Sequence, residues 1–161
     1  MRFILALLLA SFSPAASAAL EGPIHVIDAD TFDVGQVRVR LHGIDAPELG
    51  QPCNTGTQQM DCGRWAKAAV QALYEGQHAQ CTAHDRDRYG RVVASCATGG
   101  ADIGMVLVDQ GLARAYLRYS DRYALAEKAA ALAGQGLWAF EIMSPESHRA
   151  ARRSGQIQPG R

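Results

Sequence analysis

Two consecutive strand-like runs constrain the fold more than any other feature of this sequence. Residues 23–34 and 37–44 are rich in β-branched and apolar residues and are separated by a two-residue break. In the second run, VRVRLHGI, apolar and polar residues alternate with the two-residue period of a strand that has one buried face. The pair predicts a β-hairpin whose short turn brings Thr31 or Asp30 close to Arg40 across the ladder.

The rest of the chain predicts a mixture of helices and strands. Helical spacing or capping signals favour helices over residues 64–74, 103–110 and 120–133, the last with Ser120 as N-cap. Two further strands are expected over residues 77–85 and 91–97. Strands with a helix inserted among them, followed by more helices, indicate an α+β class, with a small Greek-key barrel of five strands as the leading architecture.

The first 18 residues have the composition of a secretory signal peptide. An apolar run over residues 3–9 follows a basic residue, and Ala16 and Ala18 suit cleavage before Ala19. We therefore expect a secreted or periplasmic protein. Its 161 residues suit a single domain, which we place over residues 19–143, followed by a polar, basic and flexible tail over residues 144–161.

The four cysteines form an even set, as expected for disulfides in an oxidising compartment. Three connectivities are possible. We favour Cys53 with Cys62 and Cys81 with Cys96, because each pair flanks one local excursion of the chain. On the loop-entropy argument each bridge stabilises the fold by roughly 2 to 3 kcal/mol.

The charge balance is even, with 16 basic and 16 acidic residues. A chain of zero net charge does not bind nucleic acid through bulk positive charge. Any site for an anion must therefore be local.

Oxygen ligands cluster around residues 28–48. The carboxylates of Asp30 and Asp45 and the backbone carbonyl of Ala46 are hard ligands of the kind that calcium prefers, and Glu48 is near enough to reach a bound water. Each motif taken alone is more often structural, for example a solvated strand face or a proline turn. Their combination favours a site, because DRDRYGR in a distant predicted hairpin supplies a further arginine, Arg91.

The motifs VIDADT, RVRLHGIDAPE, DRYGR and QGLARAY, in this order, resemble the staphylococcal-nuclease-like, or thermonuclease, family over residues 24–138. The resemblance implies an OB-fold five-stranded β-barrel with three α-helices. It also implies calcium-dependent hydrolysis of phosphodiester bonds in DNA or RNA. We expect a monomer that has nucleic acid as its substrate and no membrane partner.

Carried over to the matching positions, the resemblance implies a calcium site. The carboxylates of Asp30 and Asp45 and the carbonyl of Ala46 would bind the ion, and Asp28 would support it from just outside. Glu48 would act through water, as general base or as orienter of the nucleophile.

The same resemblance implies residues for the substrate. Arg40 and Arg91 would grip the scissile phosphate, since a guanidinium can bind two phosphate oxygens at once. The other expected contacts to the nucleotide or the surrounding groove are Tyr89, Arg88, Tyr116 and Tyr119.

Two other functions remain open at this stage. A non-catalytic nucleic-acid-binding OB module would share the barrel, but it gives no reason for a cluster of carboxylates that repels phosphate. A carbohydrate hydrolase that uses Asp45 and Glu48 as an acid and base pair leaves both arginines unexplained.

Overall fold

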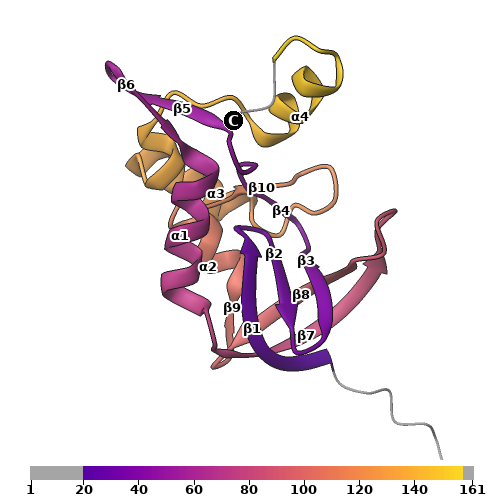
Figure 1. The fold of residues 1–161 in the computed structure, drawn as a ribbon. Helices are drawn as coiled ribbons and strands as arrows, with labels where there is room; N and C mark the ends of the chain where they lie inside the picture. The colour runs from indigo at the N-terminus through magenta and orange to yellow at the C-terminus, as the bar shows by residue number, and fades with distance from the viewer. Residues whose placement is uncertain (1–19, 158–161) are drawn as a thin grey trace, which may run out of the picture.

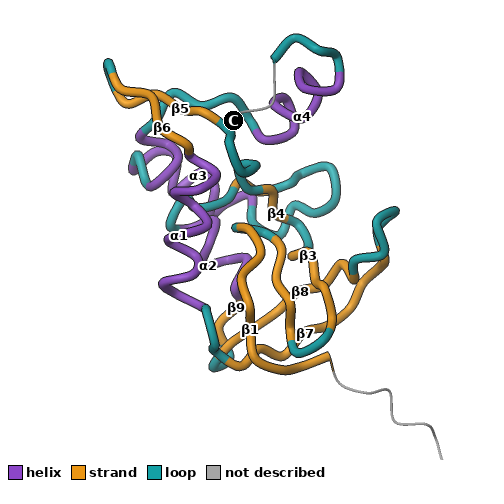
Figure 2. Tube along the Cα trace, viewed as in Figure 1, coloured by secondary structure: helices purple, strands orange, loops and turns teal. Residues whose placement is uncertain are grey.

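The computed structural model describes residues 20–157 as a closed five-stranded barrel with helices on one side (Figures 1 and 2). The expected signal peptide lies outside the described residues. The barrel strands are β1 (Leu20–Asp28), β2 (Thr31–Val34), β3 (Val37–Leu41), β7 (His78–Arg86) and β8 (Val92–Thr98). They follow the order β3-β2-β1-β7-β8, and a parallel pairing of β3 with β8 closes the barrel. A short strand, β9 (Ala101–Asp102), pairs with β8.

The alternation in the barrel strands points apolar side chains inward. Ile24, Val26, Phe32, Val39 and Leu41 are all buried, while the polar residues between them face outward or toward the site. Burial of such side chains supplies most of the driving force for folding, at about 1.5–3 kcal/mol each. The OB-type five-stranded barrel expected from the sequence is thus confirmed.

The predicted N-terminal hairpin is in fact a three-stranded meander. A turn at Ala29 and Asp30 divides the first run into β1 and β2, so Asp28 and Asp30 do not share a regular strand. The expected cross-strand contact is present, because Thr31 pairs with Arg40. The turn has a consequence for the site, since it carries Asp30 to the end of the barrel.

Residues 44–61 form short strands joined by turns. β4 (Ile44–Asp45) pairs with β10 (Arg114–Ala115), and β5 (Pro52–Thr55) pairs with β6 (Gln58–Asp61) in a hairpin that projects from the body of the molecule (Figure 1). Disulfides join Cys53 to Cys62 and Cys81 to Cys96. The first bridge closes the β5–β6 hairpin onto the following helix, and the second links β7 to β8 inside the barrel.

Three helices pack beside the barrel: α1 (Cys62–Tyr74), α2 (Ile103–Asp109) and α3 (Ala124–Ala133). The predicted apolar spacing of α1 is confirmed, with Ala66, Val70 and Tyr74 buried. Helix α3 begins later than expected, because Tyr123 rather than Ser120 is its N-cap. The hydroxyl of Tyr123 donates to Asp102, which ties this start to α2.

The C-terminal part of the chain contains more structure than the sequence predicted. A 3-10 turn, η1 (Gly136–Ala139), is followed by a fourth helix, α4 (Pro145–Arg153), within the segment expected to be a flexible tail. Ser144 caps α4 by accepting from the amide of Ser147, and Pro145 stands in its first turn. Residues 20–157 therefore contain four α-helices rather than the three expected. No helix within residues 20–157 is both long and apolar enough to cross a membrane.

Candidate active site

The turn between β1 and β2 brings Asp30 to Arg40. Arg40 Nη1 lies 3.0 Å from Asp30 Oδ2, and Arg40 Nη2 lies 3.0 Å from Asp45 Oδ1. Both carboxylates are nearly inaccessible, with relative exposures of 5% for Asp30 and 3% for Asp45. One guanidinium thus bridges two buried carboxylates, one from the turn after β1 and one from strand β4. We call Asp30, Arg40 and Asp45 the barrel floor of the site.

A sharp bend after β3 allows Asp45 to reach this position. Arg40 and Asp45 would point to opposite faces of an unbroken strand, but Gly43 has a φ of 75°, a conformation that glycine adopts readily. The chain then leaves the barrel as β4, and the amide of Ala46 donates to Asp30 Oδ2 at 3.3 Å. The bend at Gly43 thus folds Asp45 and Ala46 back over Asp30.

Arg91 reaches the same end of the barrel from the β7–β8 hairpin. Its Nε donates to Asp87 at 2.7 Å, which fixes the guanidinium, and its Nη1 donates to Thr31 Oγ1 at 3.2 Å. Thr31 in turn donates to Asp30 Oδ1 at 3.0 Å. The two arginines predicted to grip one phosphate thus flank the same aspartate, Arg40 directly and Arg91 through Thr31.

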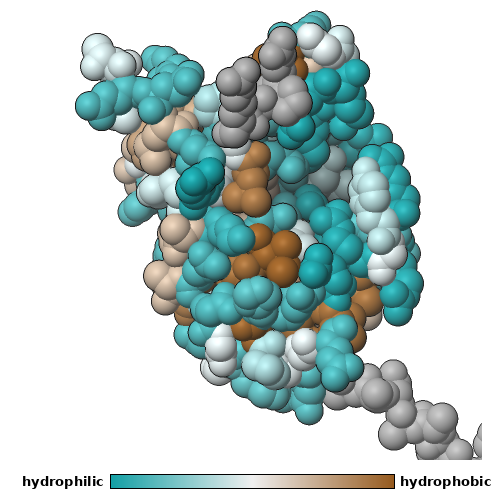
Figure 3. Space-filling view, viewed as in Figure 1, coloured by the Kyte–Doolittle hydropathy of each residue, from teal (hydrophilic) through white to brown (hydrophobic). Residues whose placement is uncertain are grey.

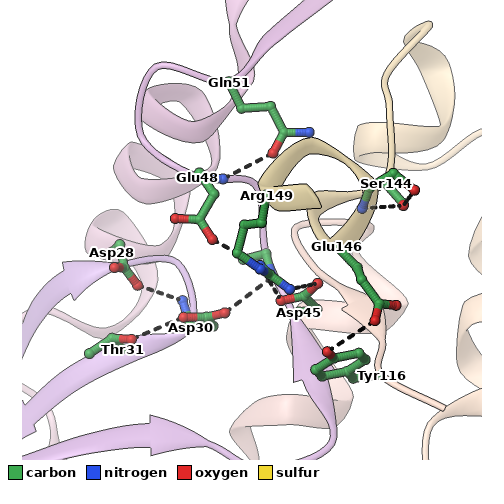
Figure 4. Close-up of polar contacts among 12 residues, drawn as sticks. Asp28, Asp30, Thr31, Asp45, Glu48, Gln51, Tyr116, Ser144, Glu146 and Arg149 are labelled. Atoms are coloured by element: carbon green, nitrogen blue, oxygen red, sulfur yellow. Dashed lines mark hydrogen bonds and ion pairs between the residues drawn. The ribbon is translucent and has the colours of Figure 1, made fainter. Parts of the chain in front are cut away.

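Glu48 lies above the floor in the turn after Pro47. Its amide donates to Gln51 Oε1, and the amide of Gln51 donates to the carbonyl of Glu48 (Figure 4). Gln51 is fully buried, and its side-chain nitrogen donates to the carbonyl of Met143 at 2.7 Å. The first turn of α1 also presses on this segment, because a Cβ at Gly63 would meet the Glu48 carbonyl oxygen at 1.9 Å. Sequence reasoning did not identify Gln51 or Gly63.

Arg149 of α4 points into the site between Asp45 and Glu48 (Figure 4). Its Nη1 lies 2.9 Å from Asp45 Oδ1 and 2.8 Å from Glu48 Oε1, and its Nη2 lies 2.8 Å from Asp45 Oδ2. From the sequence, Arg149 falls in the segment expected to be a flexible tail. The sequence does contain a helix-start signal at Ser144, Pro145 and Glu146. This signal would have placed Arg149 on an ordered helix.

Burial and charge shift several pKa values at the site. Burial, followed by repulsion from Asp30, raises the pKa of Asp28 to about 7. Burial also raises the pKa of Asp45, although hydrogen bonds from Arg149 oppose this effect. Burial alone would lower the pKa of Arg149, but hydrogen bonds to Asp45 and Glu48 outweigh it and raise the value. The hydrogen bonds from Arg149 thus favour the ionised form of Asp45 against the effect of its burial.

The remaining predicted residues surround these groups. Asp28 lies just outside, where its carboxylate accepts from the amide of Asp30 at 3.3 Å. Tyr89 is exposed in the turn between β7 and β8, with the guanidiniums of Arg88 and Arg91 over its ring at 4.9 and 5.6 Å. Tyr116 and Tyr119 stack edge to face with ring centres 4.9 Å apart.

An open cleft connects most of the predicted site residues. One wall comes from the β7–β8 hairpin, one from Tyr116, Arg118 and Tyr119, and one from α4, while Asp30, Arg40, Ala46 and Glu48 line its base. Hydrophilic side chains dominate the face of the molecule in Figure 3, with apolar ones in small patches between them. A cleft that carries arginines and exposed tyrosines over buried carboxylates suits an extended anionic ligand.

The donor set at the base of the cleft fits a hard cation. The carboxylates of Asp30 and Asp45 both pair with the guanidinium of Arg40. Those of Asp45 and Glu48 both pair with the guanidinium of Arg149. Positive charge therefore already occupies the space between the three carboxylates. Within residues 20–157 no three His, Cys, Asp or Glu side chains form a ready-made metal cluster. The fit therefore rests on Asp30 and Asp45 with the adjacent backbone, and on Glu48 at longer range.

The OB-type barrel and the cleft at its end agree with the family that the sequence comparison identifies. Residues 38–140 match the family described as staphylococcal nuclease homologue, and the chain belongs to that family.

Named relatives share most of its length. The chain is 34% identical over 160 residues to the succinoglycan biosynthesis protein ExoI of Rhizobium meliloti, which covers 96% of this chain and 81% of the relative. It is 35% identical over 127 residues to an uncharacterized endonuclease of Escherichia coli, which covers 74% of this chain and 77% of the relative. A micrococcal nuclease of Shigella flexneri is 33% identical over 109 residues, with 60% of this chain and 58% of the relative covered.

Proposed function

We propose that this protein is a secreted, calcium-dependent nuclease that hydrolyses phosphodiester bonds of DNA, RNA or both with low sequence specificity. Family membership and the names of the endonuclease and micrococcal nuclease relatives support the nuclease class. The single observation that carries the proposal is the convergence of Asp30, Arg40 and Asp45 at the base of a cleft, with Arg91 linked to Asp30 through Thr31.

Arg40 and Arg91 bind the phosphate in this mechanism. Attack on phosphorus increases the negative charge on the non-bridging oxygens, and two fixed guanidiniums stabilise that charge more in the transition state than in the ground state. The partners that fix them are Asp30 and Asp45 for Arg40 and Asp87 for Arg91. Lysine could not replace either one, because a point charge cannot bind two phosphate oxygens in parallel.

Asp30, Asp45 and the carbonyl of Ala46 would hold calcium. When bound, the ion supplies positive charge that offsets the carboxylates and stabilises the phosphate oxygens. Glu48 accepts a proton from the attacking water, or orients that water, from its position above the floor. Asp28 maintains the floor from outside through its hydrogen bond with the amide of Asp30.

The cleft also accounts for low specificity. Its walls offer arginines for phosphates, and the exposed rings of Tyr89 and Tyr119 and the partly buried ring of Tyr116 offer surfaces on which bases can stack. Stacking and phosphate contacts read little sequence. Binding that depends on phosphate contacts weakens steeply as salt rises.

The test is hydrolysis by the mature, disulfide-bonded chain of single-stranded DNA, duplex DNA and RNA, with calcium or with a chelator. Calcium-dependent cleavage is the expected result. Glu48→Gln should slow cleavage while nucleotide binding persists, and Glu141→Gln, an exposed acid away from the cleft, is the matched control.

Other outcomes would replace this proposal. Binding without cleavage would favour a non-catalytic module. Cleavage of an anionic polysaccharide but not of nucleic acid would favour a carbohydrate-directed activity, which the name of the Rhizobium meliloti relative makes worth including. Recovery of a mature protein that begins at Ala19 outside the cytoplasm would support secretion.

A further inference from the structure

We infer that Arg149 is a built-in competitor of the cation. Its guanidinium neutralises Asp45 and Glu48 in the metal-free protein, and it must leave them when the cation binds. The inference rests on the proposed calcium dependence and goes beyond it, because it assigns a role to a helix outside the barrel.

The first support is that Arg149 uses the oxygens that a cation would need. Both oxygens of Asp45 accept from it, at 2.9 and 2.8 Å, and the same Nη1 also donates to Glu48 Oε1 at 2.8 Å. Arg40, in contrast, engages only Oδ1 of Asp45. Calcium lies 2.3–2.6 Å from its oxygen ligands, so an ion on Asp45 Oδ2 and the guanidinium cannot share that oxygen in this arrangement.

The second support is electrostatic. Arg149 forms a forked pair with a carboxylate that is almost wholly buried, and its own side chain is only 24% exposed. Pairs of this geometry are stronger than ordinary surface ion pairs. A divalent ion on Asp45 Oδ2 would repel at short range the guanidinium that holds this oxygen. That guanidinium belongs to Arg149, whereas Arg40 contacts Asp45 only at Oδ1.

The third support is the way in which α4 is attached. It is a nine-residue helix near the C-terminal end of the described chain, and it belongs to no sheet of the barrel. The segment before it is tied by the bond from Gln51 to Met143, while Arg149 makes the ion pairs that reach the floor. Helix α4 is also held by the buried residues Pro145, His148 and Ala151 and by the ion pair of Glu146 with Arg118, which lies outside the barrel strands. Movement of Arg149 therefore requires no rearrangement of the strand that carries Arg40.

The exchange predicts a measurable penalty on calcium binding. If the paired state of Arg149 dominates in the metal-free protein, the apparent calcium affinity is reduced by the fraction of molecules in which the carboxylates are free. Removing the guanidinium should then tighten calcium binding by about tenfold or more.

The experiment is calorimetric titration of calcium chloride into the mature, disulfide-bonded chain and into Arg149→Gln. Arg153→Gln is the matched control, since it removes an equal charge from α4 at an exposed position. Tighter binding by Arg149→Gln alone supports the exchange. Equal or weaker binding by Arg149→Gln overturns it, as does equal tightening by Arg153→Gln, which would indicate a general charge effect.

The same titration separates this inference from the proposed function. If the unmodified chain binds calcium and Arg149→Gln binds it no more tightly, the exchange is contradicted and the proposed calcium dependence is unaffected. If neither protein binds calcium, both the proposed calcium dependence and the exchange are contradicted.

A second readout needs no variant. Hydrogen exchange at the amides of α4 in the unmodified chain should become faster on addition of calcium, because the helix loses its anchor to Asp45 and Glu48. Exchange that is unchanged or slower would contradict the inference even if Arg149→Gln failed to fold.

Discussion

Asp45 is bound by two arginines that come from contrasting parts of the molecule. Arg40 lies in β3, between the buried residues Val39 and Leu41, and its position is fixed by strand register on both sides. Arg149 lies in a terminal helix and reaches Asp45 across a separation of 104 residues. The barrel floor is thus rigid and locally determined, whereas the helical wall is held by a few side-chain contacts. We expect substitutions in the barrel floor to abolish phosphodiester cleavage, and substitutions in the helical wall, α4, to change its rate.

The largest expected effect tests the floor. Arg40→Lys should lower the rate of phosphodiester cleavage by about a hundredfold or more, because it removes a forked donor to both the carboxylates and the phosphate. Steady-state cleavage assays would measure it. A rate within a fewfold of the unmodified chain would mean that Arg40 has no special position in the site.

The next effect tests the support beneath Glu48. Gly63→Ala should destabilise the fold by about 1–3 kcal/mol, since the added Cβ would overlap the Glu48 carbonyl. The displaced turn should also slow cleavage. Denaturant unfolding with Ala68→Ser, an exposed position on the same helix, is the comparison. Equal stability of the two variants would show that the turn that carries Glu48 can move away from the added Cβ without loss of stability.

A smaller effect tests the wall. Ser144→Ala should destabilise α4 by about 1 kcal/mol, because it removes the N-cap that accepts from the amide of Ser147. Hydrogen exchange should accelerate in residues 145–153 and remain unchanged in β7 and β8. Faster exchange throughout the barrel would contradict the idea that floor and wall are independent.

The smallest effect is a pH dependence of the wall. His148 is buried on α4, and burial, followed by the nearby Arg152, lowers its pKa below 6.5; Arg149 acts in the same direction and Glu48 opposes it. The undocked helix therefore binds a proton more readily than the docked one, so docking weakens as pH falls through and below 6.5. The slope is at most about 1.4 kcal/mol per pH unit for one proton.

Amide signals of α4 followed by NMR from pH 7.5 to 5 would report this loosening. His148→Gln is the control, and its signals should not respond. A helix that becomes more ordered in acid would reverse the sign and exclude His148 as the cause.

The contrast between floor and wall also explains what the sequence could predict. Strand alternation and the bend at Gly43 are local, and they correctly brought Asp30, Arg40 and Asp45 together. The sequence did not predict the turn at Ala29 and Asp30, because no Gly, Pro or Asn marks it.

The wall could not be predicted in the same way. The contact from Gln51 to Met143 joins residues 92 positions apart, and no local pattern encodes it. Arg149 was hidden in a polar, basic segment of the kind that usually stays solvated. The roles proposed for Glu48, Arg91 and the tyrosines remain predictions that the cleavage assays address.

The disulfide between Cys53 and Cys62 bears on when the protein can become active. The amide of Cys62 donates to the carbonyl of Gln51, the residue that holds the turn of Glu48. The loop that carries the proposed proton acceptor is therefore fastened by an oxidation that a reducing cytosol does not permit. With the nuclease activity and the secretion proposed above, the chain would reach full activity only after its thiols have been oxidised.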